Sequence, residues 1–241
     1  MTDHRIPLLC LPHAGAGASF YWPWRKLLPE GLRPAPLQLP GREDRVEEEP
    51  WTDVHDAVEG LLADALDAIG DAPAVAVLGH SLGAVLAYEL ALALVQRHGV
   101  TVAELFVSGS PGPSASRTRR ASGLGDDEFL ARVEEFAGAR HPALEIPELR
   151  EMILPTLRAD VAMHEDYRPS AVTPVPFPVT CLRGRSDELV SRQDALDWSA
   201  VAGAGFRFHE LPGGHMYLTE SVPQVVDLIA DILGAEALPL R

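Results

Sequence analysis

The sequence predicts an α/β fold in which helices cover both faces of a mostly parallel sheet. Short apolar runs bounded by Gly and Pro alternate with segments of helical periodicity along most of the 241 residues. The expected strands are nearly continuous in apolar residues, as strands buried on both faces of a parallel sheet are. A hydrophobic content of 46% in a chain of this length suits one well-cored domain over residues 1–241.

Each expected strand is a short apolar run. The six runs are Ile6 to Leu11, Ala35 to Leu39, Ala74 to Leu78, Glu104 to Val107, Pro178 to Leu182 and Phe206 to Leu211. A clear amphipathic helix is expected between the second and third runs, from Val54 to Ile69, with Thr52 as its N-cap and Gly70 as its stop. Strand, helix and strand in this order provide the crossover connections that a parallel sheet needs.

Residues 111–174 break this alternation. Two helical patterns follow one another there, from about Asp127 and from about Glu148 to Asp166, with no convincing strand. We therefore expect a helical insertion, or lid, within the single domain. Its apolar faces either pack or line a substrate pocket. The candidate substrate-binding residues are Phe129, Val133, Met152 and Ile153.

Composition excludes several classes of function. A formal net charge of −15, without a stripe of Lys and Arg, argues against nucleic acid as a partner. No run approaches the ~18 apolar residues of a membrane span, and residues 1–7 lack the apolar core of a signal peptide. We therefore expect a soluble cytoplasmic protein. Cys10 and Cys181 are expected to be buried thiols, and the His spacing predicts no metal site and no other cofactor.

The motif from Gly79 to Gly83 matches G-x-S-x-G, with Ser81 at its centre. An apolar strand runs straight into it, and a helix rich in small and apolar residues follows from Ala84 to Val95. This order is typical of a nucleophile elbow, where the flanking glycines allow a tight turn that exposes the serine hydroxyl. The alternative is a glycine-rich helix start with Ser81 as a cap. The strand before the motif favours the nucleophile.

A serine hydroxyl needs a base to take its proton, and in α/β-hydrolases the chain order is serine, acid, histidine. His209 lies inside the last expected strand, whereas His215 lies in the flexible loop after it, so His215 is the expected base. Asp187, just past the penultimate strand, is the expected acid that accepts the Nδ1 proton of His215. Glu188 is adjacent, but we assign it to the solvated loop.

Hydrolysis also needs donors for the developing oxyanion. The N–H of Leu82, directly after the nucleophile, is one candidate. The second should come from the loop after the first strand, where small residues permit close approach of the backbone, and Ala14 is the expected donor. The alternatives for this loop are a plain glycine-rich turn and a phosphate-binding loop, and the latter lacks its following Lys.

Several stretches together resemble the type II thioesterases that accompany polyketide synthases and nonribosomal peptide synthetases. They are Leu11 to Tyr21, Leu39 to Arg42, Gly79 to Gly83, and Gly213 to His215. The resemblance covers nearly the whole chain, including the lid. It implies a Ser-His-Asp enzyme that hydrolyses acyl groups from the phosphopantetheine arm of acyl or peptidyl carrier proteins. One departure is Glu188, at a position where many relatives have Pro.

The partner that the resemblance implies is an acyl or peptidyl carrier protein, and such carriers are usually acidic. Docking on an acidic enzyme then needs a local basic patch. Arg117, Arg119 and Arg120 form a tight cluster at the start of the insertion, and its alternative is a solvated loop. Two other functions remain open: a small-molecule carboxylesterase or lipase on the same fold, and a non-catalytic module that binds acyl carriers.

Overall fold

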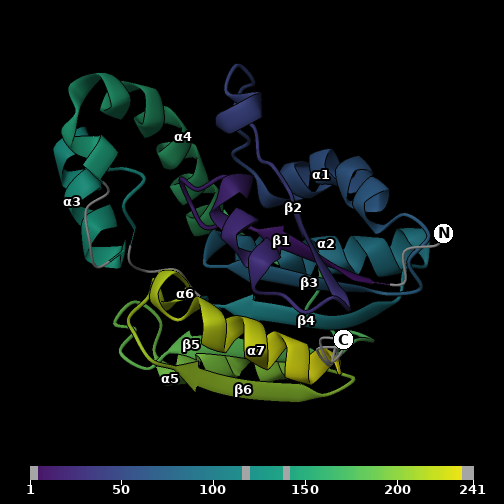
Figure 1. Cartoon of the computed structure of the whole chain (residues 1–241). Coiled ribbons are helices and arrows are strands. Elements are labelled where there is room, and N and C mark those ends of the chain that lie inside the picture. Colours follow the sequence, from purple (N-terminus) through teal and green to yellow (C-terminus); the bar gives the residue numbers. More distant parts are fainter. Residues whose placement is uncertain (1–4, 116–119, 138–141, 235–241) are drawn as a thin grey trace.

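Six parallel strands form one sheet in the computed structural model, which describes residues 5–115, 120–137 and 142–234 (Figure 1). The strand order across the sheet is β2-β1-β3-β4-β5-β6, and every neighbouring pair is parallel. The strands are β1 (Ile6–Leu11), β2 (Leu32–Pro36), β3 (Val75–His80), β4 (Val102–Ser108), β5 (Val179–Gly184) and β6 (Phe206–Leu211). The predicted parallel α/β architecture is confirmed.

Helices connect the strands and cover the sheet. The α-helices are α1 (Val54–Ile69), α2 (Leu82–His98), α3 (Asp126–Ala137), α4 (Pro147–Asp166), α5 (Arg192–Leu196), α6 (Tyr217–Glu220) and α7 (Val222–Leu233). Short 3-10 segments are η1 (Ala18–Lys26), η2 (Glu43–Arg45), η3 (Pro142–Glu145) and η4 (Asp197–Val201). Within the described ranges, no helix is both long and apolar enough to cross a membrane.

The two faces of the sheet bury alternate residues of the same strands. Leu9 and Leu11 of β1 join Val77 of β3 in the core cluster that contains the apolar residues of α1 and α2. Leu8 and Cys10 join instead the cluster formed with η1 and α7. Successive side chains of a strand point to opposite faces. The near-continuous apolar strands of the sequence therefore fill two separate cores.

The second strand begins three residues earlier than the sequence suggested, at Leu32 instead of Ala35. It is an edge strand, and among the described residues it pairs with β1 alone, with Ile6 opposite Leu32 and Cys10 opposite Pro36. An edge strand tolerates prolines because one row of its backbone groups needs no partner. The predicted start was wrong because prolines argue against a strand, and this run contains two of them.

The first helix is capped by Asp53, whereas Thr52 was expected. The Asp53 side chain accepts hydrogen bonds from the backbone N–H groups of His55 and Asp56. These amides have no partner inside the helix, and a short carboxylate at the N-cap satisfies them. The helix itself, Val54–Ile69, and its stop at Gly70 match the prediction.

Between β4 and β5 the described residues form α3, η3 and α4. Figure 1 shows α3 and α4 together at one end of the sheet, on the far side from the labelled termini. These helices have an apolar cluster of their own. Its buried members are Ala121, Phe129, Leu130, Leu144, Leu154 and Leu157.

The strand order defines where a site can form. From β1 the chain moves to β2 on one side, and it then crosses back to β3 on the other side. The loops after β1 and β3 therefore leave neighbouring strands in opposite directions and open a crevice at their carboxyl ends. The loop that begins at Pro12 and the turn at Ser81 both lie at this switch point.

Candidate active site

Ser81 lies at the tight turn between β3 and α2. Its backbone has φ of 54° and ψ of −114°, a conformation that residues other than glycine rarely adopt. The flanking glycines make this turn possible. A Cβ on Gly79 would lie 1.8 Å from the carbonyl oxygen of Gly83, and a Cβ on Gly83 would lie 2.1 Å from that of Leu11. The strand, strained turn and helix of a nucleophile elbow are all present.

His215 and Asp187 form a buried, hydrogen-bonded pair. Nδ1 of His215 lies 2.9 Å from Oδ2 of Asp187, while Oδ1 accepts the backbone N–H groups of Leu189 and Val190, each at 2.9 Å. Burial acts to raise the pKa of Asp187, but the hydrogen bond and charge of His215, with the two amides, outweigh it and hold this pKa below its ordinary value. The carboxylate therefore stays ionised and orients the imidazole.

The loop after β5 is held in place by Arg183. Its guanidinium donates to the carbonyl oxygens of Asp187 and Val190, both at 2.7 Å. Asp187 is buried at this turn, whereas Glu188 is exposed. The two adjacent carboxylates thus point to different environments, as the sequence analysis expected.

The end of β4 brings His215 close to the elbow. The N–H of Ser81 donates to the carbonyl oxygen of Ser108 at 2.8 Å. A Cβ on the next residue, Gly109, would lie 3.3 Å from Cε1 of His215, and the ring centroids of His215 and His80 are 5.1 Å apart. The imidazole of His215 therefore packs beside the backbone that carries Ser81.

The two expected oxyanion donors lie on segments in contact. Leu82 is the first residue of α2, so its N–H has no partner within the helix. The start of this helix abuts the chain that leads to Ala14, since a Cβ on Gly83 would meet the carbonyl oxygens of Leu11 and Pro12. Throughout the described ranges, neither the Ala14 nor the Leu82 amide donates a hydrogen bond to another residue.

Behind His215 lies a buried polar chain that the sequence analysis did not foresee. Nδ1 of His80 is 2.8 Å from Oγ of Ser108, which is 2.5 Å from the hydroxyl of Tyr217. Burial, and then the charges of His215 and His13, lower the pKa of His80 well below its ordinary value. The position of His80 next to Ser81 in the motif was the one available signal.

The candidate substrate-binding residues divide into two groups. Phe129 is fully buried in the lid cluster, and Val133 and Ile153 pack partly buried against it. Met152 is instead exposed, at 58% of its surface. Ala14 packs against the same cluster. The apolar interior of the lid therefore reaches the expected oxyanion loop.

Of the candidate docking residues, Arg120 lies in the described part of the chain, whereas Arg117 and Arg119 lie outside it. Arg120 is exposed, and its guanidinium pairs with Asp166 at 2.5 Å and with Glu165 at 3.5 Å. Both carboxylates lie at the end of α4. The positive charge of Arg120 is thus partly neutralised within the lid.

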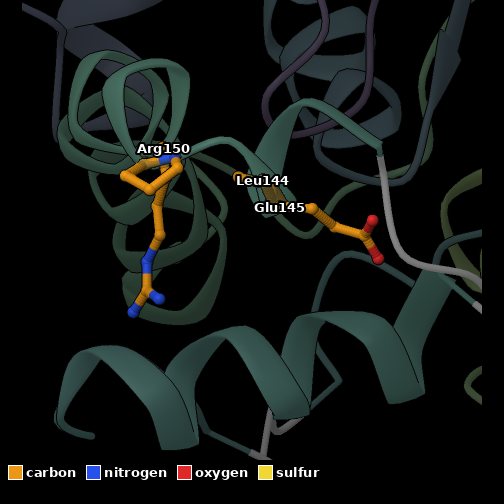
Figure 2. A pocket seen from close by; sticks show the side chains of 4 residues that line it. Leu144, Glu145 and Arg150 are labelled. Carbon is orange, nitrogen blue, oxygen red and sulfur yellow. The ribbon is translucent and has the colours of Figure 1, made fainter.

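A small hollow of about 290 Å³ lies in the lid, lined by Leu144, Glu145, Pro147 and Arg150 (Figure 2). Figure 2 shows the charged groups of Glu145 and Arg150 pointing in different directions. The guanidinium of Arg150 also binds Asp127 of α3 at 2.7 Å. None of the candidate substrate-binding residues lines this hollow, so we do not equate it with the acyl site.

Both cysteines are buried thiols. Burial raises the pKa of the Cys181 thiol to about 12 and also raises that of Cys10, so neither is a thiolate nucleophile at neutral pH. Across the described residues, no group of three or more His, Cys, Asp or Glu side chains could hold a metal ion.

A parallel sheet with a strained serine elbow and a buried His-Asp pair at its carboxyl end defines a hydrolase of the α/β-hydrolase class. Residues 6–233 match the family described as Thioesterase domain. The chain therefore belongs to the thioesterase-domain family, and its resemblance to the type II thioesterases is confirmed.

Relatives and solved structures agree with this family. The chain is 31% identical over 236 residues to the gramicidin S biosynthesis protein GrsT of Aneurinibacillus migulanus, covering 98% of this chain and 91% of that protein. It is 34% identical to the thioesterase PikA5 of Streptomyces venezuelae, with coverage of 95% and 81%. The type II thioesterase BorB from the borrelidin biosynthetic cluster superposes with a TM-score of 0.82 at 33% identity, covering 97% and 93%.

Proposed function

We propose that this chain is a discrete thioesterase that removes acyl groups from the phosphopantetheine arm of carrier proteins in nonribosomal peptide or polyketide pathways. Family membership and the named type II thioesterase relatives support the reaction class. The observation that carries the mechanism is the buried His215–Asp187 pair packed beside the strained Ser81 turn. This is the arrangement that acyl transfer to a serine requires.

In the first half-reaction, Oγ of Ser81 attacks the carbonyl carbon of the thioester while Nε2 of His215 takes the hydroxyl proton. The carbonyl oxygen becomes an oxyanion that accepts hydrogen bonds from the Ala14 and Leu82 amides. The C–S bond then breaks. His215 returns its proton to the departing sulfur, so the pantetheine thiol leaves and the acyl group remains as an ester on Ser81.

In the second half-reaction, His215 takes a proton from water, which attacks the same carbonyl carbon. The tetrahedral intermediate collapses, Ser81 recovers its proton from His215, and the free acid leaves. Asp187 stays ionised throughout and stabilises the imidazolium, as its lowered pKa favours. These side chains, two backbone amides and water account for every proton in the cycle.

The insertion at 111–174 has the role of a lid over the acyl chain in this proposal. Two observations support it: Ala14 packs against the apolar cluster of the lid, and a Cβ on Gly15 would lie 3.0 Å from Cδ1 of Leu157. Phe129, Val133, Met152 and Ile153 remain the candidates for chain-length selection. Arg117, Arg119 and Arg120 remain the candidates for carrier docking.

The test compares substrates that differ in one atom. A thioesterase should hydrolyse an acyl-pantetheine thioester much faster than the matched oxoester, and mass spectrometry of a panel of acyl-loaded carriers should show which chains are removed. Faster turnover of the oxoester would favour the carboxylesterase alternative. Failure of a fluorophosphonate probe to label Ser81 would favour a non-catalytic carrier-binding module.

A further inference from the structure

A buried ion pair joins two segments that are far apart in the sequence. Nη1 and Nη2 of Arg42 lie 2.5 and 2.8 Å from Oδ2 and Oδ1 of Asp160, a two-pronged contact between the stretch after β2 and helix α4 of the lid. Asp160 is fully buried and Arg42 is 8% exposed. A buried pair of this kind often adds little stability over an apolar replacement. Stability alone therefore does not explain why an ion pair lies between these two segments.

Both partners also bind the loop after β1. Oδ2 of Asp160 accepts the N–H of Gly15 at 2.7 Å, and Nη1 of Arg42 donates to the carbonyl oxygen of Ala16 at 3.1 Å. Within the loop, the N–H of Ala16 donates to the carbonyl oxygen of His13 at 3.1 Å. The bonds to the Gly15 N–H and to the His13 carbonyl oxygen hold the two peptide planes on either side of Ala14, and the Arg42 bond holds the peptide that follows Ala16.

This geometry determines where the Ala14 amide points. The carbonyl of His13 and the N–H of Ala14 belong to one trans peptide, so they point in opposite directions. Because the carbonyl of His13 is turned toward Ala16, the N–H of Ala14 is turned the other way. As described above, this amide donates no hydrogen bond within the described part of the chain and is available to a ligand.

Helix α4 holds the same region by two more contacts. Leu157, one turn before Asp160, lies against Gly15, and the hydroxyl of Thr156 donates to the carbonyl oxygen of Gly41 at 2.8 Å. This part of α4 is thus fixed to the loop after β1 and to the stretch that contains Arg42.

We propose that Arg42 and Asp160 are positioning residues, which together hold the loop after β1 so that the Ala14 amide is directed at the oxyanion. This rests on the proposed function, in which Ala14 is an oxyanion donor. Neither side chain touches the reacting atoms. The C-terminal half of α4 is accordingly part of the catalytic structure, in addition to covering the substrate.

The experiment measures transition-state binding separately from ground-state binding. Asp160→Asn and Arg42→Lys are compared with wild type for kcat and KM on a small acyl-pantetheine thioester. Two inhibitors are compared in parallel: a trifluoromethyl ketone analogue, which forms an oxyanion on Ser81, and a pantetheine thioether, which has a methylene group in place of the thioester carbonyl. We expect kcat to fall on the order of 10² with KM unchanged. Affinity for the ketone should fall by a similar factor, and thioether affinity should not change.

A matched control is Glu89→Gln. Glu89 is another buried carboxylate that accepts a backbone amide, that of Ser170 at 3.0 Å, but it does not touch the loop after β1. This variant should lose thermal stability without losing kcat. The double variant Arg42→Met/Asp160→Leu, which replaces the pair by apolar groups, should recover stability but not kcat. This variant provides the test if Asp160→Asn does not fold.

Two results would overturn the proposal. One is a kcat within threefold of wild type in the folded Asp160→Asn or double variant, and the other is equal loss of affinity for ketone and thioether. Failure of the proposed function itself gives a different result, because Ser81→Ala would then keep turnover whatever happens at Asp160.

Discussion

Nδ1 of His215 lies 2.9 Å from one carboxylate oxygen of Asp187, and the other oxygen of that carboxylate already accepts two backbone amides. Both oxygens of the carboxylate thus accept hydrogen bonds. The two backbone amides on one oxygen position the other oxygen toward the imidazole. This pair fixes both the orientation and the tautomer of the histidine, and it gives the first prediction.

Asp187→Asn should keep the fold but reduce turnover on the order of 10⁴. An amide can still accept the Leu189 and Val190 N–H groups through its oxygen, but its NH₂ group then faces Nδ1 and favours the wrong tautomer of His215. Steady-state kinetics and a thermal melt measure the two effects. The control is Glu188→Gln at the exposed neighbouring position, which should behave as wild type. A mild effect at Asp187 beside a large one at another carboxylate would move the acid elsewhere.

His80 predicts how stability depends on pH. Its pKa is lowered in the folded protein, where the ring faces His215, His13 and Tyr217, whereas the unfolded chain takes up the proton near pH 6.5. The contribution of neutral His80 to the free energy of unfolding is therefore intact above about pH 6.5. It is lost as the pH falls below this value, by up to ~1.4 kcal/mol per pH unit. When the free energy of unfolding is measured with denaturant between pH 7.5 and 5.5, it should change less steeply with pH for His80→Gln than for wild type. Equal slopes would refute this role.

Two lid residues should respond differently to truncation. Phe129 is fully buried in the lid cluster, so Phe129→Ala should lower the free energy of unfolding by ~3–5 kcal/mol. Met152 is exposed, so Met152→Ala should change stability by less than ~0.5 kcal/mol. We expect Met152→Ala to alter the preference among acyl chain lengths, measured with a series of acyl-pantetheines. A uniform change across the series would argue against contact with the acyl chain.

Reversing the arginine cluster should weaken docking of the carrier. Arg117→Glu/Arg119→Glu/Arg120→Glu is expected to raise KM for an acyl-carrier protein several-fold and to leave kcat/KM for acyl-pantetheine unchanged, because surface charges act mainly on encounter. Arg97→Glu is the charge control, since Arg97 pairs with Glu59 on α1. The double variant that retains Arg120 tests whether its pairing with Asp166 matters. Unchanged carrier kinetics at low ionic strength would eliminate this surface.

Sequence patterns predicted the features that depend on residues close together in the chain. The apolar strands, the amphipathic helix ending at Gly70 and the serine turn follow from periodicity and glycine spacing. His215 and Asp187 were selected by their places after the last two strands, and the structure brings the two together. The predicted range of the second strand was wrong because a strand tolerates prolines only at the edge of a sheet. Apolar periodicity does not identify which strand lies at the edge.

Long-range contacts were not accessible from the sequence. Arg42 and Asp160 are 118 residues apart, and neither lies in a pattern that predicts the pairing. The chain from His80 through Ser108 to Tyr217 joins the ends of β3 and β4 to the start of α6 in the same way. Each of these follows from packing between elements, which periodicity along one element does not report.

The most direct test of the account is intact-protein mass spectrometry of the enzyme quenched during turnover of an acyl-carrier substrate, together with the turnover of Ser81→Ala and His215→Ala. We predict an added mass equal to the acyl group, located on Ser81. Each variant should lose on the order of 10⁶ in turnover, with little further loss when the two are combined, because the residues act as a unit. Turnover of His215→Ala within tenfold of wild type, or an acyl group on a residue other than Ser81, would contradict the account.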